Sequence, residues 1–130
     1  MKCLDTDFLV ALLRGKNDAK SKMELLDAEG RNATTTINAF ELFYGAHKST
    51  KRAKNLKEVF KLLDRLDIFD FTLEASEVAG EITAILENEG KMLDFRDIMI
   101  ASIIKCHRII LVTGNIEHFK RIKDLQIEKW

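Results

Sequence analysis

Four acidic residues stand where a ligand-binding site would need them. Each follows an apolar, strand-like segment or lies at the start of a helix-like one: Asp5, Glu41, Asp94 and Asp97. In an open α/β sheet the carboxyl ends of parallel strands share one edge, and ligands bind there. Acids that are far apart in sequence would converge at that edge, and because like charges repel, such a group indicates a bound cation. The four acids therefore predict a Mg²⁺ or Mn²⁺ site used for phosphoryl chemistry.

Asp5 also has a simpler interpretation, as the cap of the helix that follows it. Asp and Thr are both good N-cap residues, because their side-chain oxygens accept a bond from a free backbone N–H. Asp7 or Thr6 is the better predicted cap for the helix over 8–13. That choice leaves Asp5 free to point into a site.

The other acids have similar alternatives. Glu41 lies in the apolar run 39–43, where a charge needs a partner or a metal unless it faces outward. Asp94 and Asp97 open one helix, and one of them is predicted to cap it while the other is functional. Asp94 fits the cap, in a pattern that resembles a capping box with Asp97.

Short apolar strands alternate with helices along the chain and would position these acids. Strands are predicted over 2–4, 33–36, 68–71, 109–112 and, at a sheet edge, 125–127. Helices are predicted over 8–13, 17–28, 39–47, 51–66, 73–88, 94–107 and 117–122, with Asn38 capping or interrupting before the third. The alternation predicts an α/β fold with a mostly parallel sheet, and the length of 130 residues suits a single domain over 1–130.

Composition narrows the class of protein further. Hydrophobic residues make up 46% of the chain, which indicates a globular fold, and 21 basic residues balance 21 acidic ones, which argues against a generally basic nucleic-acid-binding surface. The charge is nevertheless uneven. Residues 48–61 hold six basic residues and one acid, whereas 67–97 hold nine acids and two bases. The basic run is either a phosphate-contacting surface or a solvated helix face.

The chain shows no sign of export or membrane insertion. It has no secretory signal, and no apolar run approaches the roughly 20 residues that span a bilayer, so a cytoplasmic protein without membrane contact is expected. Cys3 and Cys106 lie in apolar contexts and are predicted to be reduced core residues. The three histidines, His47, His107 and His118, lack a zinc-ligand pattern and are expected to have structural or surface roles.

Taken together and in order, four blocks of sequence resemble a PIN domain, in particular the VapC-type toxin ribonucleases. The blocks are CLDTDFLVALL with Asp5, TTTINAFELFYG with Glu41, LDFRDIMIAS with Asp97, and IILVTGNIEHF with Thr113 and Phe119. The resemblance covers essentially the whole chain. One position departs from it: many family members carry Asp where this chain has Asn115, which can offer a carbonyl oxygen but no charge. Asp94, Glu117 or His118 are candidates to compensate.

The resemblance implies a three-layer α/β/α domain that hydrolyses RNA. Asp5, Glu41 and Asp97 would bind one or two Mg²⁺ or Mn²⁺ ions, assisted by Asn115 and Asp94, and Thr113 would orient a carboxylate or a water. Water, rather than a side chain, would attack the phosphodiester. The resemblance also implies a homodimer and a cognate antitoxin that blocks the acidic pocket. Exposed aromatic residues among Phe40, Phe43 and Tyr44 are candidates for either interface, and core packing is expected for one or two of them.

Two other functions fit parts of the sequence. The first is a non-catalytic PIN-like module that binds RNA or a protein, an alternative that Asn115 keeps open. The second is a small phosphatase, because Asp5-Thr6-Asp7 is similar to the start of haloacid-dehalogenase-like enzymes. Leu9 and the lack of a well-placed later Lys depart from that pattern. A response-regulator receiver domain matches less well, because the chain lacks a suitable pair of phospho-accepting Asp and Lys.

Overall fold

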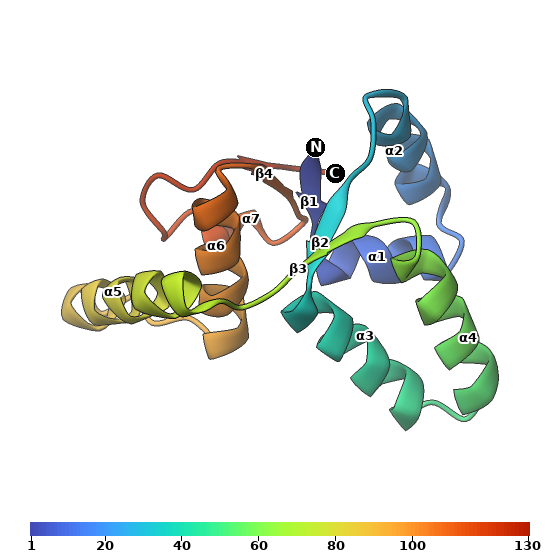
Figure 1. Ribbon diagram of the computed structural model, residues 1–130, viewed down its shortest axis with the longest axis horizontal. Helices are drawn as coiled ribbons and strands as arrows, with labels where there is room; N and C mark the ends of the chain where they lie inside the picture. Colours follow the sequence, from blue (N-terminus) through green and yellow to red (C-terminus); the bar gives the residue numbers. More distant parts are fainter.

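The computed structural model describes residues 1–130 as a five-stranded sheet between two layers of helices (Figure 1). The strands are β1 (Lys2–Leu4), β2 (Ala33–Thr35), β3 (Asp67–Phe69), β4 (Ile110–Val112) and β5 (Ile127–Glu128). Every pairing is parallel, and the strand order is β3-β2-β1-β4-β5. The predicted α/β/α fold with a mostly parallel sheet is confirmed, and the sheet is parallel throughout.

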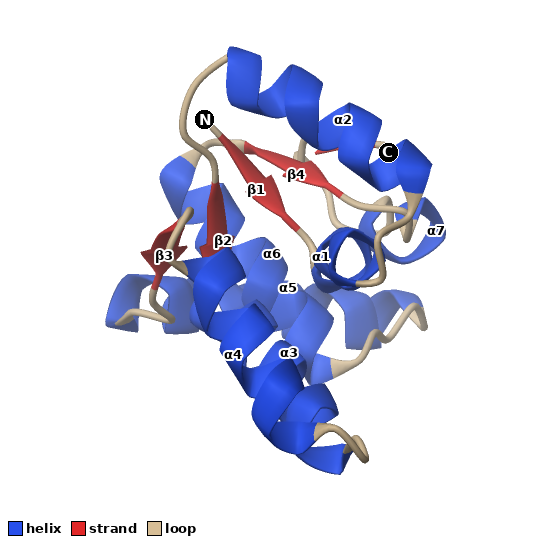
Figure 2. Ribbon diagram, turned by 90° about the vertical axis from the view of Figure 1, so that its right-hand side faces the viewer, coloured by secondary structure: helices blue, strands red, loops and turns tan.

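Seven helices cover the two faces of this sheet. They are α1 (Thr6–Leu13), α2 (Asn17–Ala28), α3 (Thr36–Lys48), α4 (Arg52–Leu63), α5 (Leu73–Glu89), α6 (Phe95–His107) and α7 (Ile116–Phe119). Helices α1 to α4 lie on one side of the strands and α5 to α7 on the other (Figures 1 and 2). Helices α3 and α4 form an antiparallel pair that projects beyond the sheet (Figure 1).

Two apolar cores hold the layers together, one on each face of the sheet. Because side chains of a strand alternate between faces, β1 sends Leu4 to one core and Cys3 to the other. The first core joins Leu4 to fully buried Phe8 and Leu9 of α1 and to residues of α2, α3 and α4. The second joins Cys3 to residues of α5, α6 and β4 and to Phe119. Strand β1 therefore anchors both layers at the centre of the sheet.

The direction in which successive strands are added to the sheet changes at β1. From β1 the chain builds β2 and β3 on one side, and after α5 and α6 it returns to β4 on the other side. Connections that leave two neighbouring parallel strands in opposite directions open a crevice at their carboxyl ends. Asp5 follows β1 and Thr113 follows β4 at this point, and the Asp5 backbone N–H donates to the Val112 carbonyl at 3.0 Å. The crevice between β1 and β4 is thus where a ligand site is expected.

Some predicted element boundaries were wrong for identifiable reasons. The first helix begins at Thr6 rather than Phe8, because Asp5 is its N-cap. Helix α3 begins at Thr36, because Thr35 caps it and Asn38 lies inside the first turn as the other half of a capping box. The third strand covers Asp67–Phe69 instead of 68–71, and α7 ends at Phe119 instead of 122.

The two cysteines differ in burial. Cys3 is fully buried as predicted, whereas Cys106 is only half-buried, so the prediction of a core position was wrong for it. Both are free thiols. None of the helices combines the length and apolar character needed to cross a bilayer.

Candidate metal centre

Asp5 lies at the centre of the crevice and is almost completely buried. Its Oδ1 accepts hydrogen bonds from the Thr6 backbone N–H at 2.8 Å and from Asn38 Nδ2 at 3.1 Å. Its Oδ2 accepts the Thr113 hydroxyl at 2.7 Å. The prediction that Asp7 or Thr6 caps α1 and leaves Asp5 free was wrong, because one carboxylate both caps the helix and faces the crevice. Thr113 was predicted to orient a carboxylate or a water, and its contact here is with the Asp5 carboxylate.

Glu41 reaches the same crevice from α3 through a polar chain. Its Oε1 accepts the Thr6 hydroxyl at 2.8 Å, and that hydroxyl accepts from Asn38 Nδ2 at 2.9 Å. Asn38 is fully buried, and its amide therefore connects Asp5 of the first strand end with Thr6 and Glu41. Sequence reasoning missed Asn38 as a site residue, since an Asn near a helix start is most often read as a cap.

Asp97 and Asp94 take different roles at the start of α6. Asp94 is the N-cap: its Oδ1 accepts the Arg96 backbone N–H at 2.9 Å, and its side chain also pairs with the Arg96 guanidinium. Asp97 lies three residues after Asp94 and lines the pocket, with its Oδ2 3.5 Å from His118 Nδ1. Asp94 does not line the pocket. Arg96 reaches toward the site and lies 3.8 Å from Glu41.

An open pocket of about 390 Å³ joins these groups. None of its lining residues is hydrophobic: they are Asp5, Thr6, Asp7, Glu41, Asp97, Gly114 and Asn115. Of the predicted site residues, four line this pocket, Thr113 lies directly behind Asp5, and Asp94 is outside. Parallel strand ends led us to expect Asp5, Glu41, Asp94 and Asp97 to converge, and three of these four acids do so; Asn115 was a candidate through the family resemblance alone.

Asp7 also lines the pocket, although the sequence suggested for it only a helix cap or part of a phosphatase-like start. Its Oδ2 accepts the Gly114 backbone N–H at 2.8 Å, and its Oδ1 lies 3.4 Å from Trp130 Nε1. A Cβ at residue 114 would lie 2.7 Å from Asp7 Oδ2, so glycine permits this close approach. These contacts join α1 to the loop after β4 and to the C-terminal tail, and no local pattern encodes them.

Burial makes the negative charges of this pocket costly. It raises the pKa of Asp5 to about 7, against the opposing effect of the Thr113 hydrogen bond, with Asp7 and Asp97 adding to the rise. Burial also raises the pKa of Glu41, opposed by the Thr6 hydroxyl and Arg96, and the pKa of Asp97, opposed by His118. In contrast, hydrogen bonds from Arg96 lower the pKa of exposed Asp94. The three pocket acids thus form one site whose negative charge favours a cation.

The donor set fits a hard divalent ion held partly through water. The three acids come from three different elements and spread over the pocket, and no three His, Cys, Asp or Glu side chains are close enough to form a complete ligand set by themselves. Carboxylate and amide oxygens are the ligands that Mg²⁺ and Mn²⁺ prefer, and Mg²⁺ usually keeps several waters. A spread, open and wholly polar pocket is compatible with that mode of binding.

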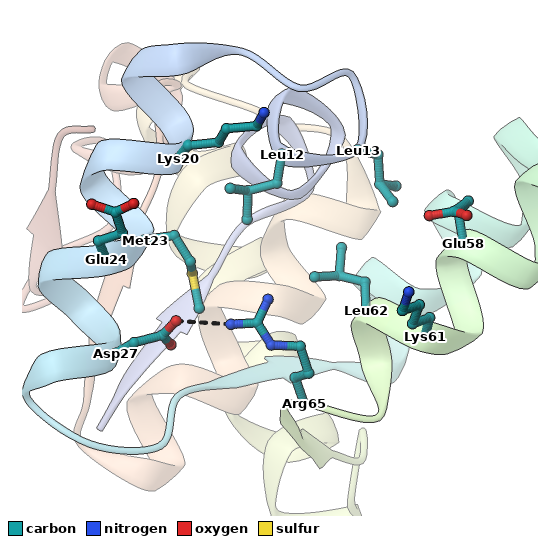
Figure 3. A pocket seen from close by; sticks show the side chains of 10 residues that line it. All are labelled: Leu12, Leu13, Lys20, Met23, Glu24, Asp27, Glu58, Lys61, Leu62 and Arg65. Carbon is teal, nitrogen blue, oxygen red and sulfur yellow. Dashed lines mark hydrogen bonds and ion pairs between the residues drawn. The ribbon is translucent and has the colours of Figure 1, made fainter.

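Two other hollows lie among helices α1 to α4. One of about 590 Å³ runs between α1, α3 and α4, shares Glu41 with the acidic pocket and carries the basic residues Arg14 and Lys54. The other, of about 400 Å³, lies between α1, α2 and α4 (Figure 3). Across it Arg65 Nη2 and Asp27 Oδ2 are 2.8 Å apart, and it contains none of the candidate site residues. Only the first hollow continues the acidic pocket.

Comparison with known proteins identifies the family. The PIN domain family matches residues 2–125. The chain belongs to the PIN-domain family. Ribonuclease VapC2 of Rickettsia felis is 35% identical over 128 residues, which cover 98% of this chain and 96% of that protein. The tRNA(fMet)-specific endonuclease VapC of Salmonella typhimurium is 31% identical over 127 residues, with the same two coverages.

Solved structures of VapC-type proteins also match the fold of this chain. The structure of VapBC2 from Rickettsia felis bound to a DNA fragment from its promoter matches with a TM-score of 0.92 and 34% identity, over 99% of this chain and 98% of the other. DNA-bound VapBC from Salmonella typhimurium matches with a TM-score of 0.90 and 29% identity, over 100% and 99%. The resemblance to VapC-type PIN domains inferred from four blocks is therefore confirmed over the whole chain.

Proposed function

We propose that this protein is a divalent-metal-dependent endoribonuclease, the toxin of a VapBC-type toxin–antitoxin pair, formed by residues 1–130 as one PIN-like domain and acting in the cytoplasm. One observation carries the proposal. Asp5, Glu41 and Asp97, from three separate elements, line one polar pocket at the β1–β4 crevice of a chain whose relatives are VapC ribonucleases. Buried, mutually repelling carboxylates at a crevice are the arrangement that metal-assisted phosphodiester hydrolysis requires.

Each side chain has a definite task in this proposal. Asp5, Glu41 and Asp97 hold Mg²⁺ or Mn²⁺, and Asn115 adds an amide oxygen at the pocket wall. Thr113 fixes the Asp5 carboxylate by donating to its Oδ2. The chemistry that a bound divalent cation supplies is a more acidic water and neutralisation of charge on the phosphate.

Two further residues act at a distance from the reacting phosphate. Asn38 holds Asp5 and Thr6 in a fixed relation, since its Nδ2 lies within hydrogen-bond distance of both. Asp94 acts only through Arg96, whose guanidinium it pairs with. That guanidinium also faces Glu41.

The substrate is RNA whose backbone is accessible, in a single strand or a loop. The hollow between α1, α3 and α4 starts at Glu41 and carries the cations Arg14 and Lys54 beside one further acid, Glu58. Its two cations offer a path for phosphates that leads away from the acidic pocket. Exposed basic residues continue from the end of α3 through the loop and along α4, where they are available to contact further phosphates: Lys48, Lys51, Arg52, Lys54, Lys57 and Lys61. Since a similar protein is named for tRNA(fMet) cleavage, tRNA loops are the first substrates to test.

A cognate antitoxin and a second copy of the chain are the proposed protein partners. The two related structures described above are VapBC complexes, which supports a cognate antitoxin. We infer that this antitoxin covers the acidic pocket. For the homodimer, exposed aromatic surface is the supporting feature. Phe40 and Tyr44 stack on each other on α3 and are both about half exposed, whereas Phe43 packs on Phe60 and the first core. Core packing is thus the role of Phe43 alone among the three.

A non-catalytic PIN-like module is the second candidate, and Asn115 favours it. An amide at the pocket wall adds no negative charge, so the pocket is less acidic than one with a fourth carboxylate. Arg96, 3.8 Å from Glu41, reduces the net charge further. Such a module would bind RNA or a protein through the same surface without cutting.

The test is cleavage of an end-labelled RNA pool that includes tRNAs, with Mg²⁺ or Mn²⁺ and with EDTA. The Asp97→Asn variant removes one charge from the pocket, and Asp70→Asn, at an exposed loop position, is the matched control. We expect cleavage that requires the metal, persists in Asp70→Asn and falls by about 100-fold or more in Asp97→Asn. Metal-independent cleavage, or equal rates in Asp97→Asn, would contradict the proposed site. Absence of cleavage together with absence of metal binding by calorimetry would favour the non-catalytic module.

A further inference from the structure

His118 places a nitrogen donor beside the acidic pocket. It lies on the short helix α7, close to the β4 loop, and its side chain is about half exposed. Its Nδ1 is 3.5 Å from Asp97 Oδ2 and 2.7 Å from the side-chain amide of Asn115. Both of these neighbours line the pocket. The imidazole therefore meets the pocket through Nδ1, at the edge formed by Asp97 and Asn115.

Nδ1 of His118 is the ring nitrogen that faces both pocket residues, and its donor or acceptor role depends on the tautomer. When Nδ1 carries a proton it donates to Asp97 Oδ2, the interaction that opposes the rise in the Asp97 pKa. When the proton is on Nε2, Nδ1 and Asp97 Oδ2 are two electron-pair donors 3.5 Å apart at the pocket wall, and a cation between them takes the place of the proton.

The spacing of these donors suits a single ion. Ligands that occupy neighbouring positions of an octahedral ion with bonds of about 2.1 Å lie about 3 Å apart. The separation of 3.5 Å between Nδ1 and the Asp97 oxygen is close to that distance. Rotation of the Asn115 amide would present its oxygen as a third donor, a rotation that costs only the bond to Nδ1.

We propose that His118 is a ligand of the catalytic metal through Nδ1, together with Asp97, and that it makes the site prefer Mn²⁺ over Mg²⁺. The inference rests on the proposed function, since it concerns the same pocket. Mg²⁺ takes oxygen ligands and loses its waters reluctantly, whereas transition-metal ions accept imidazole nitrogen readily. An imidazole in the position where a carboxylate would serve Mg²⁺ equally well therefore selects between the two ions. It also supplies a ligand where Asn115 supplies no charge.

The other histidines provide matched controls. His107 lies at the opposite end of α6 from Asp97 and stacks on Phe69, with 3.7 Å between ring centroids. His47 is near the end of α3, six residues after Glu41, and does not line the pocket. A nitrogen signal on bound Mn²⁺ that depends on residue 118 and survives loss of residue 107 can come only from the proposed ligand.

The experiment measures metal binding directly, without RNA. Mn²⁺ is added to the full-length protein, unlabelled and labelled with ¹⁵N-histidine, and nitrogen coupling to the ion is recorded by pulsed electron paramagnetic resonance. Mn²⁺ and Mg²⁺ affinities are measured by calorimetry for wild type and for His118→Gln, His118→Glu, His107→Gln and Asp97→Asn. Circular dichroism checks that each variant is folded.

We expect histidine nitrogen coupling in wild type and His107→Gln, and its loss in His118→Gln. His118→Gln should bind Mn²⁺ about tenfold or more weakly, at least the effect of losing an outer-shell partner, while its Mg²⁺ affinity changes little. His118→Glu should bind both ions with similar affinity. Mn²⁺ binding that depends on Asp97 but shows no histidine coupling would overturn this inference and leave the proposed function standing. Mn²⁺ binding that is absent, or insensitive to Asp97→Asn, would overturn both.

Discussion

Replacing Asp5 by Asn should make the metal-free protein more stable at neutral pH while removing a proposed metal ligand. The folded protein raises the pKa of Asp5 from 3.8 to about 7, chiefly because the carboxylate is buried. In the folded state the group therefore holds its proton over a pH range in which the unfolded chain has lost it. Stability falls wherever the folded state binds more protons than the unfolded state as pH rises. The penalty from Asp5 is absent below about pH 4, grows between pH 4 and 7, and is complete above pH 7.

The size of this effect follows from the shift. A rise of about three pKa units corresponds to about 4 kcal/mol at 1.36 kcal/mol per unit. Asn keeps an oxygen for the Thr6 and Asn38 donors but turns its amide toward Thr113, whose hydroxyl then loses its acceptor. That loss costs about 1 to 2 kcal/mol at every pH. Asp5→Asn should therefore be about 1 to 2 kcal/mol less stable than wild type near pH 4 and roughly 2 to 3 kcal/mol more stable at pH 8.

Urea unfolding between pH 4 and 8, in the presence of a chelator, measures this difference. Taking the difference between wild type and variant removes the contributions of Glu41 and Asp97, whose pKa values are also raised. The exposed Asp70→Asn replacement should give a curve parallel to wild type. The reasoning fails if the difference in the free energy of unfolding between wild type and Asp5→Asn changes by less than about 1 kcal/mol between pH 4 and pH 8.

Three other perturbations follow from the contacts of the site. Asn38→Ala leaves buried partners around Asp5 without their amide donor, and urea unfolding at pH 7 should show a loss of about 2 to 3 kcal/mol; an unchanged midpoint would contradict the proposed bridging role. Thr113→Val removes the donor to Asp5 Oδ2 while keeping the side-chain shape, so cleavage at saturating RNA should fall about tenfold or more with the fold retained by circular dichroism. The double variant Arg14→Gln and Lys54→Gln should raise KM for RNA with little change in kcat, and should reduce the slope of log affinity against log salt by about 1.4 in filter binding. An unaltered salt slope would exclude this groove as the path of the phosphates.

The sequence predicted three of the acids that converge, Asp5, Glu41 and Asp97, and was wrong for Asp94, which lies outside the pocket. Parallel strands end at one edge, so residues that follow different strands were expected to lie near one another, and Asp5 and Thr113, which follow the neighbouring strands β1 and β4, are hydrogen-bonded there. Glu41 and Asp97 were found by the same argument, because each lies in the first turns of a helix that starts at that edge. Hydrophobic periodicity and capping residues predict only local elements. A parallel sheet then brings the carboxyl ends of its strands to one edge, which places residues that are distant in sequence near one another.

The parts that could not be predicted depend on side-chain reach across the site. Asp7 accepts from Gly114 and lies near Trp130, residues more than one hundred positions away in sequence. His118 was one of three candidates to compensate for Asn115, but its contact with Asp97 depends on the direction of the short helix α7, in which Phe119 packs into the second core. Sequence spacing places such residues on an element but does not say at which angle the element meets its neighbours.

The prediction for Asp5 was wrong because it assumed that a residue either caps a helix or takes part in the site. A carboxylate has two oxygens with about four acceptor positions, and an N-cap bond uses one of them. At Asp5 the Oδ1 atom caps α1 while Oδ2 remains for Thr113 and the pocket, so one residue performs both roles. At α6 the roles divide, because Asp94 precedes the helix and its carboxylate turns back to Arg96, whereas Asp97, one turn further on, faces outward from the helix start into the pocket. Whether an acid near the start of a helix enters the pocket therefore depends on the direction of the helix axis relative to the crevice. Packing of the helix against the sheet sets that direction.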